Sequence, residues 1–206
     1  MFPSGGTMLE RPPDLDEKLR QIDSYYESQL QYPYLFVDEA RRAAGFDGDS
    51  EMVYGTTPGR LTVELLELAG ARPDDIFYDL GCGVGQCVLA AALFCTRATG
   101  VEILAPLAAL GASAAQALKL PNASFRTTDL RTTDIRDGTL IYCYSTCMKP
   151  DTREQVARLV ATTASGARVL SVTHNLEHPA LELVSQHEMQ WDDATRTVYL
   201  HLRKAG

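Results

Sequence analysis

The stretch Phe77-Tyr78-Asp79-Leu80-Gly81-Cys82-Gly83-Val84-Gly85-Gln86 decides the fold of this chain. It begins in an apolar run, passes through glycines at three alternate positions and enters an apolar segment with helical character. Glycine tolerates positive φ and lets a ligand lie against bare backbone, where larger side chains would collide with it. The stretch is therefore typical of a strand that delivers a nucleoside cofactor to the N-terminus of a helix.

The glycine spacing separates two classes of cofactor. A dinucleotide fingerprint requires glycine at position 86, where Gln86 stands, so NAD is the less favoured cofactor. The pattern acidic-x-Gly-x-Gly-x-Gly resembles motif one of the class I S-adenosylmethionine (SAM) methyltransferases. This resemblance implies that Asp79 lies near the methionine end of SAM and that Glu102, at the end of the next strand, accepts hydrogen bonds from the ribose hydroxyls. The interval between the two acids fits one βαβ unit.

Composition describes an ordinary globular protein. The 206 residues suffice for one sizeable core, and 45% of them are hydrophobic and 22% charged. No long apolar run and no leader pattern is present, so we expect neither membrane insertion nor export, and a cytoplasmic location. The five cysteines are odd in number and form no CxxC pair, which favours reduced thiols over disulfides or a metal site.

The net charge of −8 bears on the partners. Proteins that hold DNA or RNA normally show a basic face, and the basic residues of this chain are not clustered enough to form one. We therefore expect no nucleic-acid partner, whereas a cationic target would be attracted. Nothing in the sequence indicates an oligomeric state.

The N-terminal quarter reads as an extension. Residues 1–13, rich in proline and glycine, predict a mobile arm, and a helix is expected from Asp14 to just before Pro33, followed by a short helix over 37–44. We place this arm and helical extension in residues 1–52 and the methyltransferase domain in 53–206. The aromatic residues of the extension either pack it on the main domain or form the wall of a substrate channel. They are Tyr25, Tyr26, Tyr32, Tyr34 and Phe36.

The remaining chain alternates strands and helices. Strands are predicted over 76–80, 98–101, 123–127, 139–144 and 168–173, and an antiparallel pair over 188–191 and 196–202. Helices are predicted over 59–68, 86–95, 104–118 and 151–161, the first capped by Thr57 and the last by Asp151. This alternation predicts an α/β fold, a Rossmann-like seven-stranded class I methyltransferase sheet of five parallel strands plus a C-terminal antiparallel hairpin.

A closer resemblance covers residues 53–179. Val53-Tyr54-Gly55-Thr56-Thr57, the glycine loop and Gly100-Val101-Glu102 are similar to the matching segments of the non-SET protein-lysine methyltransferases, the disruptor-of-telomeric-silencing type. Together with the glycine loop, this resemblance implies a set of SAM contacts: Tyr54, Thr57, Asp79, Gly81, Gly83, Gln86, Glu102 and Asp129. Asp129 would hold the adenine amino group, a role for which Asp134 is the alternative.

The segment after the fourth strand departs from that family. Cys143-Tyr144-Ser145-Thr146-Cys147-Met148-Lys149-Pro150 stands where the family carries Val-Asn-Asn-Phe-Ala-Phe-Gly-Pro, and the family's basic nucleosome-binding segment is missing. The catalytic candidates near the transferred methyl group are Tyr144, Ser145 and His174. Tyr144 is a candidate for directing a lone pair, and His174 either accepts a proton or is a loop histidine that only contacts its neighbours.

Three functions follow from these residues. The first is SAM-dependent N-methylation of an amine, in a protein lysine, a peptide or a small molecule. The second keeps the cofactor and moves the acceptor to a hydroxyl or thiol of a small molecule. The third is a non-catalytic SAM-binding protein whose changed segment after the fourth strand no longer performs chemistry.

Overall fold

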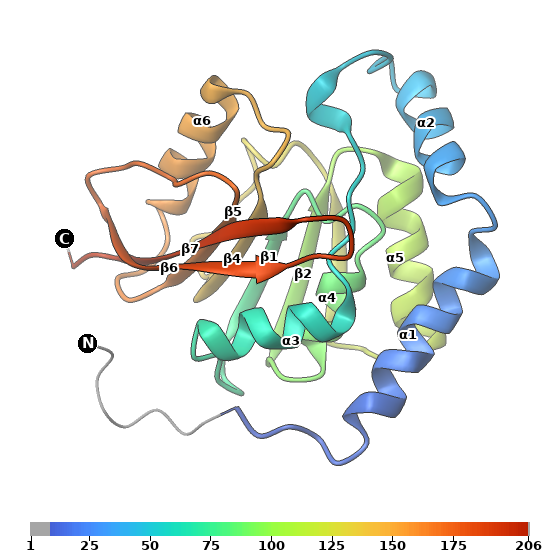
Figure 1. The fold of residues 1–206 in the computed structure, drawn as a ribbon, viewed down its shortest axis with the longest axis horizontal. Helices are drawn as coiled ribbons and strands as arrows, with labels where there is room; N and C mark the ends of the chain where they lie inside the picture. The colour runs from blue at the N-terminus through green and yellow to red at the C-terminus, as the bar shows by residue number, and fades with distance from the viewer. Residues whose placement is uncertain (1–8, 206) are drawn as a thin grey trace.

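The computed structural model describes residues 9–205, and residues 1–8 of the predicted arm lie outside the described residues. A seven-stranded sheet forms the centre of this part of the chain (Figure 1). Its strands are β1 (Ile76–Leu80), β2 (Arg97–Glu102), β3 (Ala123–Thr127), β4 (Leu140–Tyr144), β5 (Arg168–Val172), β6 (Leu181–Gln190) and β7 (Thr195–Arg203). The helices are α1 (Leu15–Gln29), α2 (Pro33–Ala43), the 3-10 helix η1 (Ser50–Met52), α3 (Gly59–Leu68), α4 (Gln86–Ala92), α5 (Ala105–Ala117) and α6 (Pro150–Val160).

The strand order β3-β2-β1-β4-β5-β7-β6 confirms the predicted fold class. The first five strands run parallel, and β7 pairs antiparallel with both β5 and β6. The central strands are buried along almost their whole length, as the continuous apolar runs of a parallel sheet predict. Strand order reverses between β1 and β4, so a crevice is expected at the carboxyl ends of these two strands.

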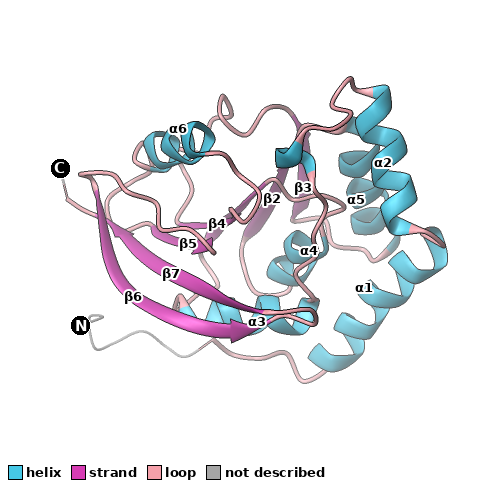
Figure 2. Cartoon of the chain, turned by 45° about the horizontal axis from the view of Figure 1, so that its top comes forward, coloured by secondary structure: helices cyan, strands magenta, loops and turns pink. Residues whose placement is uncertain are grey.

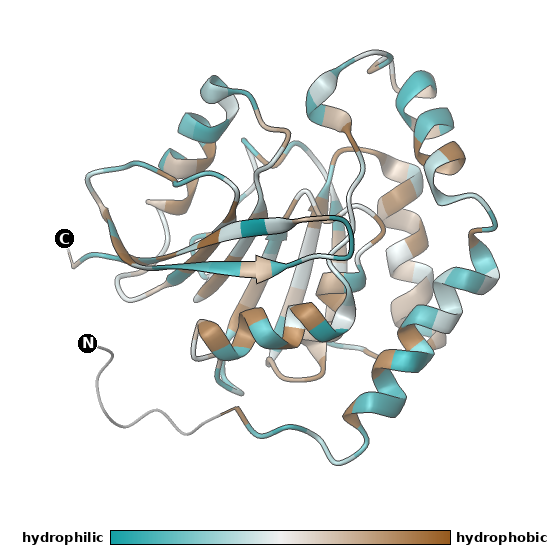
Figure 3. Ribbon diagram, in the orientation of Figure 1, coloured by the Kyte–Doolittle hydropathy of each residue, from teal (hydrophilic) through white to brown (hydrophobic). Residues whose placement is uncertain are grey.

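Helices cover both faces of the sheet (Figure 2). One core lies under α1, α3, α4 and α5, and a second, smaller core lies under α6 on the other face. Figure 3 shows hydrophobic residues gathered along the sheet and α5, whereas α1 is largely hydrophilic on the side seen there. Helix α1 buries one stripe at helical spacing, made of Leu15, Leu19, Ile22 and Tyr26.

The aromatic residues of the N-terminal segment divide between two environments. Tyr26 is buried and donates a hydrogen bond from its phenol to the carbonyl of Val84, in the glycine loop, at 2.5 Å. Tyr32 and Tyr34 are 63% and 72% exposed, and the ring of Tyr34 meets that of Tyr54 edge-on at 6.1 Å between centroids. The packing interpretation thus holds for Tyr26, while Tyr34 contacts a residue of the site described below.

Several predicted boundaries were wrong. Helix α2 begins at Pro33, because proline suits the first helical position, and not near residue 37. The C-terminal strands β6 and β7 are ten and nine residues long, well beyond the short pair predicted, with an irregularity between Leu183 and Ser185. Asp151 does not cap α6: Lys149 holds the cap position, and Pro150 begins the helix.

Gly85 is required where α4 begins. Its φ is +89°, and a Cβ there would lie 2.6 Å from Cζ of Phe125 and closer still to Cε1. We expect Gly85→Ala to lower the free energy of unfolding by about 2–4 kcal/mol, because roughly 1–2 kcal/mol of left-handed strain adds to the cost of overpacking. Gly166→Ala is the matched control, since Gly166 has φ +85° and open space around its Cα. Equal losses in denaturant unfolding of the two variants would contradict a role for the collision with Phe125.

Candidate active site

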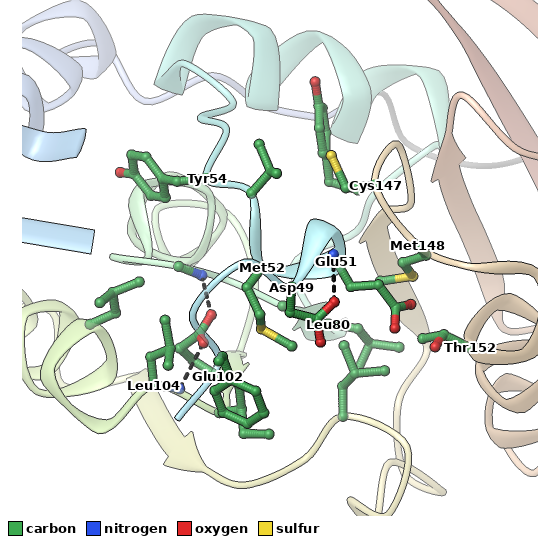
Figure 4. Close-up of a pocket in the computed structure, with 18 of the residues that line it drawn as sticks. Asp49, Glu51, Met52, Tyr54, Leu80, Glu102, Leu104, Cys147, Met148 and Thr152 are labelled. Atoms are coloured by element: carbon green, nitrogen blue, oxygen red, sulfur yellow. Dashed lines mark hydrogen bonds between the residues drawn. The ribbon is translucent and has the colours of Figure 1, made fainter. Parts of the chain in front are cut away.

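A cavity of about 440 Å³ lies at the carboxyl ends of the parallel strands. It is bounded by the ends of β1, β2 and β4, the loop after β3, and the segment 49–55 that precedes α3 (Figure 4). A smaller cavity of about 30 Å³ adjoins it and shares Tyr54, Gly55, Gly81 and Tyr144 with it. The larger volume falls in the range of small-molecule sites, roughly 300–1,000 Å³.

All the residues predicted to contact the cofactor line these two cavities. The larger one is lined by Tyr54, Gly81, Gly83, Glu102 and Asp129. The smaller one is lined by Thr57, Asp79 and Gln86, and again by Tyr54 and Gly81. The fold thus brings the set together, and its role in binding the cofactor stays a prediction.

The glycine turn is tied to the neighbouring strand. The amides of Gly81 and Cys82 both donate to the carbonyl of Val101, at 2.9 and 3.1 Å. Gly81 and Gly83 have φ of +85° and +55°, and a Cβ on Gly83 would lie 3.1 Å from the ring of Tyr54. Because Gly83 has no side chain, the ring of Tyr54 can lie close to the backbone of the turn.

Glu102 closes the turn from the end of β2. One carboxylate oxygen accepts the amide of Gly83 at 2.9 Å, and the other accepts the amide of Leu104 at 2.8 Å. Burial raises the pKa of this carboxyl group, and the backbone donors act in the opposite direction. The carboxylate is therefore held in a fixed orientation beside the cavity, with lone pairs left for further donors.

Asp79 is the most deeply buried acid of the site, with 2% of its surface exposed. Burial first and the nearby Glu102 second raise its pKa to about 8, while a hydrogen bond with Cys87 acts in the opposite direction. Such a carboxyl group changes charge near neutral pH and ionises most readily when a cation lies beside it. A cationic ligand in the smaller cavity would supply that charge.

Thr57 differs from its predicted structural role. It does not cap α3, whose cap position is held by Pro58 without a side-chain hydrogen bond. Its hydroxyl instead lies 2.7 Å from the phenol oxygen of Tyr142, deep beside the smaller cavity. Thr57 thus joins the segment before α3 to β4.

The two candidate adenine acids differ in position. Asp129 lines the larger cavity and pairs with Arg131, which lowers the pKa of Asp129 mainly through the side-chain hydrogen bonds. Asp134 is exposed, pairs with Arg136 and does not line either cavity. The arrangement favours Asp129 over its alternative.

Sequence reasoning missed a wall of the cavity formed by the segment around η1. Asp49 and Glu51 line the same cavity as Glu102 (Figure 4). The ammonium of Lys149 lies 3.0 Å from Asp49 and 3.4 Å from Glu51, while its amide donates to Glu51 at 2.7 Å. Only the acidic character of Asp47-Gly48-Asp49-Ser50-Glu51 signals this contact, and its partner lies about a hundred residues away.

The three catalytic candidates occupy different places. Tyr144 lines both cavities. Ser145 is fully buried and donates its hydroxyl to the carbonyl of Val172 at 2.5 Å, so the structure does not place it at the site and we do not retain it as a catalytic residue. His174 lines neither cavity, and burial, with Arg153 nearby, lowers its pKa.

Burial favours the protonated form of three thiols near the site, Cys82, Cys87 and Cys143. Burial raises the pKa of Cys82 and Cys87 well above the usual range, and that of Cys143 to about 12. Thiols in that state are poor nucleophiles. Within residues 9–205, no cluster of three or more histidines, cysteines or acids is placed to hold a metal ion.

The residues present fit SAM. Glycines in the turn leave bare backbone where a side chain would fill the cavity, Glu102 offers oriented acceptors for hydroxyls, and Asp79 offers a buried carboxyl group for a cation. Fold and site together define the class of the protein as the class I SAM-dependent methyltransferases. Within this class, the chain belongs to the family described as Histone methylation protein DOT1, which matches residues 34–203.

Solved structures share this fold. An RNA methyltransferase from Salinibacter ruber in complex with S-adenosyl-L-homocysteine aligns with a TM-score of 0.63 and 24% identity, over 74% of this chain and 95% of that one. TrmN from Thermus thermophilus aligns with a TM-score of 0.66 and 20% identity, over 80% and 53% of the two chains. Magnesium protoporphyrin IX methyltransferase from Synechocystis PCC 6803, with bound SAM, aligns with a TM-score of 0.60 and 14% identity, over 84% and 97%.

A curated relative matches more locally. This chain is 44% identical over 52 residues to a protein-lysine N-methyltransferase from Saccharolobus islandicus (strain REY15A). The match covers 24% of this chain and only 32% of the relative's length. In the described part of the chain, every helix is too short or too polar to span a membrane.

The charge of Asp79 predicts a pH dependence. SAM carries a net positive charge, so the ionised carboxylate should bind it better than the protonated acid. With a pKa of about 8, we expect SAM affinity to rise between pH 6 and pH 8, by at most about tenfold per pH unit, and to level off above. Calorimetric titration measures this rise, and Asp79→Asn should bind weakly with no such slope. A rise of the same size in Asp79→Asn would contradict the assignment.

The carboxyl group of Asp79 also makes the free energy of unfolding depend on pH, in the direction opposite to SAM affinity. The native carboxyl holds a proton that the unfolded chain releases, so this contribution is complete below about pH 4 and is lost as the pH rises to about 8. The free energy of unfolding of the cofactor-free protein should therefore fall over this range, and less steeply in Asp79→Asn.

Proposed function

We propose that this protein transfers a methyl group from SAM to an amine, and that the side chain of a lysine in a protein or peptide is the acceptor. The observation that carries the proposal is the position of Tyr144, which lines both the large cavity beside Glu102 and the small one beside Asp79. A group from outside that reaches Tyr144 therefore reaches the junction of the two cavities. The family and the named activity of the relative from Saccharolobus islandicus support a lysine acceptor.

The main task of the chain's own residues would be to hold the cofactor and to orient the acceptor. When bound, SAM supplies a methyl group that its sulfonium already activates, so the protein has to align a nucleophile with it. Holding two reactants in line can contribute roughly 7–11 kcal/mol of the barrier. The glycine turn, Glu102 and Asp79 would fix the cofactor, and the segment 53–57 would cover it.

Tyr144 is the residue that would orient the amine. Burial raises its pKa, so its phenol stays neutral over the physiological range and can accept or donate a hydrogen bond. A lysine that gives its proton to solvent at neutral pH, before its lone pair attacks the methyl group, does so at a cost of about 4–5 kcal/mol, since its pKa is near 10.4. His174 is neutral near pH 7, but it lines neither cavity, so we assign it no part in this proton transfer.

Labelled SAM tests the proposal. The purified protein is incubated with methyl-labelled SAM and either poly-L-lysine or a cell lysate that is afterwards separated by size. We expect label in poly-L-lysine and in lysate proteins, recovered as methyl-lysine after hydrolysis. Label confined to small molecules would replace the amine of a protein with a small-molecule acceptor, including a hydroxyl or thiol. SAM binding without any transfer would instead favour a non-catalytic SAM-binding protein.

A further inference from the structure

The turn that joins β6 to β7 reaches the ring of Tyr144. The guanidinium of Arg196 lies 5.7 Å from the centroid of the Tyr144 ring and 5.5 Å from that of Trp191. The two aromatic rings meet each other at 5.9 Å between centroids and a tilt of 60°. A cation at this distance from an aromatic face is held by the ring's electron density. The C-terminal hairpin therefore contacts a residue of the site some fifty positions earlier in the chain.

Arg196 is itself anchored in the turn. It donates two hydrogen bonds to the carboxylate of Asp193, at 2.8 and 2.7 Å, and a third to the carbonyl of Ala194 at 3.2 Å. Its side chain is 15% exposed although the neighbouring turn residues are exposed. A two-point bond of this kind fixes the plane of the guanidinium as well as its position. The guanidinium of Arg196 is thus held over the Tyr144 ring in one orientation.

The segment that precedes α3 passes close to the Tyr144 ring at Gly55. A Cβ added to Gly55 would lie 3.5 Å from Cε1 of Tyr144, so a side chain at this position would touch the ring. Tyr144 is half-buried and lines both cavities. Neither Arg196 nor Trp191 lines either of these two cavities, so we expect their effect on a ligand there to pass through Tyr144.

We infer that Arg196 is a positioning residue for methyl transfer: pinned by Asp193, it clamps the ring of Tyr144 from the hairpin turn and so fixes the wall against which the acceptor is aligned. This inference rests on the proposed function. Lysine cannot replace arginine here, because an ammonium lacks both the planar face and the two-point bond. SAM itself should bind normally without the clamp, since the turn that carries Arg196 lines neither of the two cavities.

A double-mutant cycle between positions 144 and 196 tests the inference. In methyl transfer to poly-L-lysine, Arg196→Met and Arg196→Lys should each lower kcat by roughly tenfold while the Kd for SAM changes less than about twofold. In a Tyr144→Leu background, the Arg196→Met change should alter kcat less than about twofold, because the clamp has nothing left to hold. The matched control is Arg158→Lys, whose arginine pairs with Glu154 on the surface of α6, and it should behave as wild type.

A merely structural role predicts a different outcome. Arg196→Met would then lower kcat by the same factor in both backgrounds, or would weaken SAM binding in step with turnover, and either result overturns the inference. Wild-type kcat in Arg196→Met also overturns it.

A readout other than activity separates this inference from the proposed function. Trp191 is the only tryptophan of the chain, so its quenching by acrylamide reports on the hairpin turn alone. We expect Arg196→Met to raise the quenching constant roughly twofold, and less so in the Tyr144→Leu background. If the effects of Arg196→Met and Tyr144→Leu on the quenching constant were simply additive, the clamp would be overturned, even if no methyl transfer were measurable. A wild-type protein that binds SAM, shows this coupling and leaves poly-L-lysine unlabelled would instead count against the acceptor proposed above.

Discussion

Replacing Glu102 by alanine should lower the affinity for SAM by roughly 100-fold or more. Hydrogen bonds to a charged group contribute about 1.5–3 kcal/mol each, and tenfold in affinity corresponds to about 1.4 kcal/mol, so loss of two bonds to the ribose accounts for the factor. The amides of Gly83 and Leu104 lose their acceptor in the same variant, which loosens the turn before the cofactor arrives. Isothermal calorimetry measures the loss, and circular dichroism checks the fold.

Two further variants define what Glu102 contributes. Glu102→Gln keeps the shape but offers one acceptor oxygen to two amide donors, so we expect a clear but smaller loss of affinity. Asp134→Ala removes an exposed acid of the same charge that does not line either cavity, and it should bind SAM as the wild type does. Wild-type affinity in Glu102→Ala, or the same loss in Asp134→Ala, would contradict the placement of the ribose beside Glu102.

Asp75→Ala should cost about 3–5 kcal/mol of stability, because it leaves a buried arginine without its counter-ion. Asp75 and Arg168 form a salt bridge whose side chains are 3% and 6% exposed. Asp75 also accepts the hydroxyl of Thr139 and the amide of Arg72, each at 2.6 Å, so one carboxylate joins the starts of β1, β4 and β5 to the loop after α3. Chemical denaturation at constant pH measures the loss.

The control for Asp75→Ala is the loss of an ion pair that is exposed and not buried. Glu154→Ala breaks an exposed pair with Arg158, both about 60% exposed, and should change stability by less than about 1 kcal/mol. The double variant Asp75→Leu with Arg168→Met removes both charges and should recover much of the lost stability. If Asp75→Ala were no worse than Glu154→Ala, the buried pair would not hold these strands together.

The central sheet and the conformation of the glycine loop could be predicted from the sequence because their signals are local. Apolar runs of five residues, glycines at alternate positions and an acid at the next strand end lie within about 25 residues of one another. Gly81, Gly83 and Gly85 all have the positive φ that their spacing implies. The strands β6 and β7 were underestimated because their polar, partly exposed residues lack this apolar pattern.

The misses arise where a distant part of the chain supplies the partner. The sequence predicts Thr57 as a helix cap, yet its hydroxyl forms a hydrogen bond with the phenol of Tyr142, 85 positions away in the chain. Ser145 was grouped with Tyr144, although neighbours in an extended segment point to opposite sides. Its hydroxyl is accordingly turned to Val172, and strand alternation alone would have separated the two residues.

Helix α1 supports the glycine loop from outside the part of the chain that the family match covers. That match starts at residue 34, whereas the phenol of Tyr26 holds the carbonyl of Val84 between two of the glycines. A shortened chain that starts where the homology starts would expose the apolar stripe of α3 and α4 that α1 covers and would free the loop on that side. Crystallisation or inhibitor screening of the catalytic unit should therefore use a chain that starts ahead of Leu15.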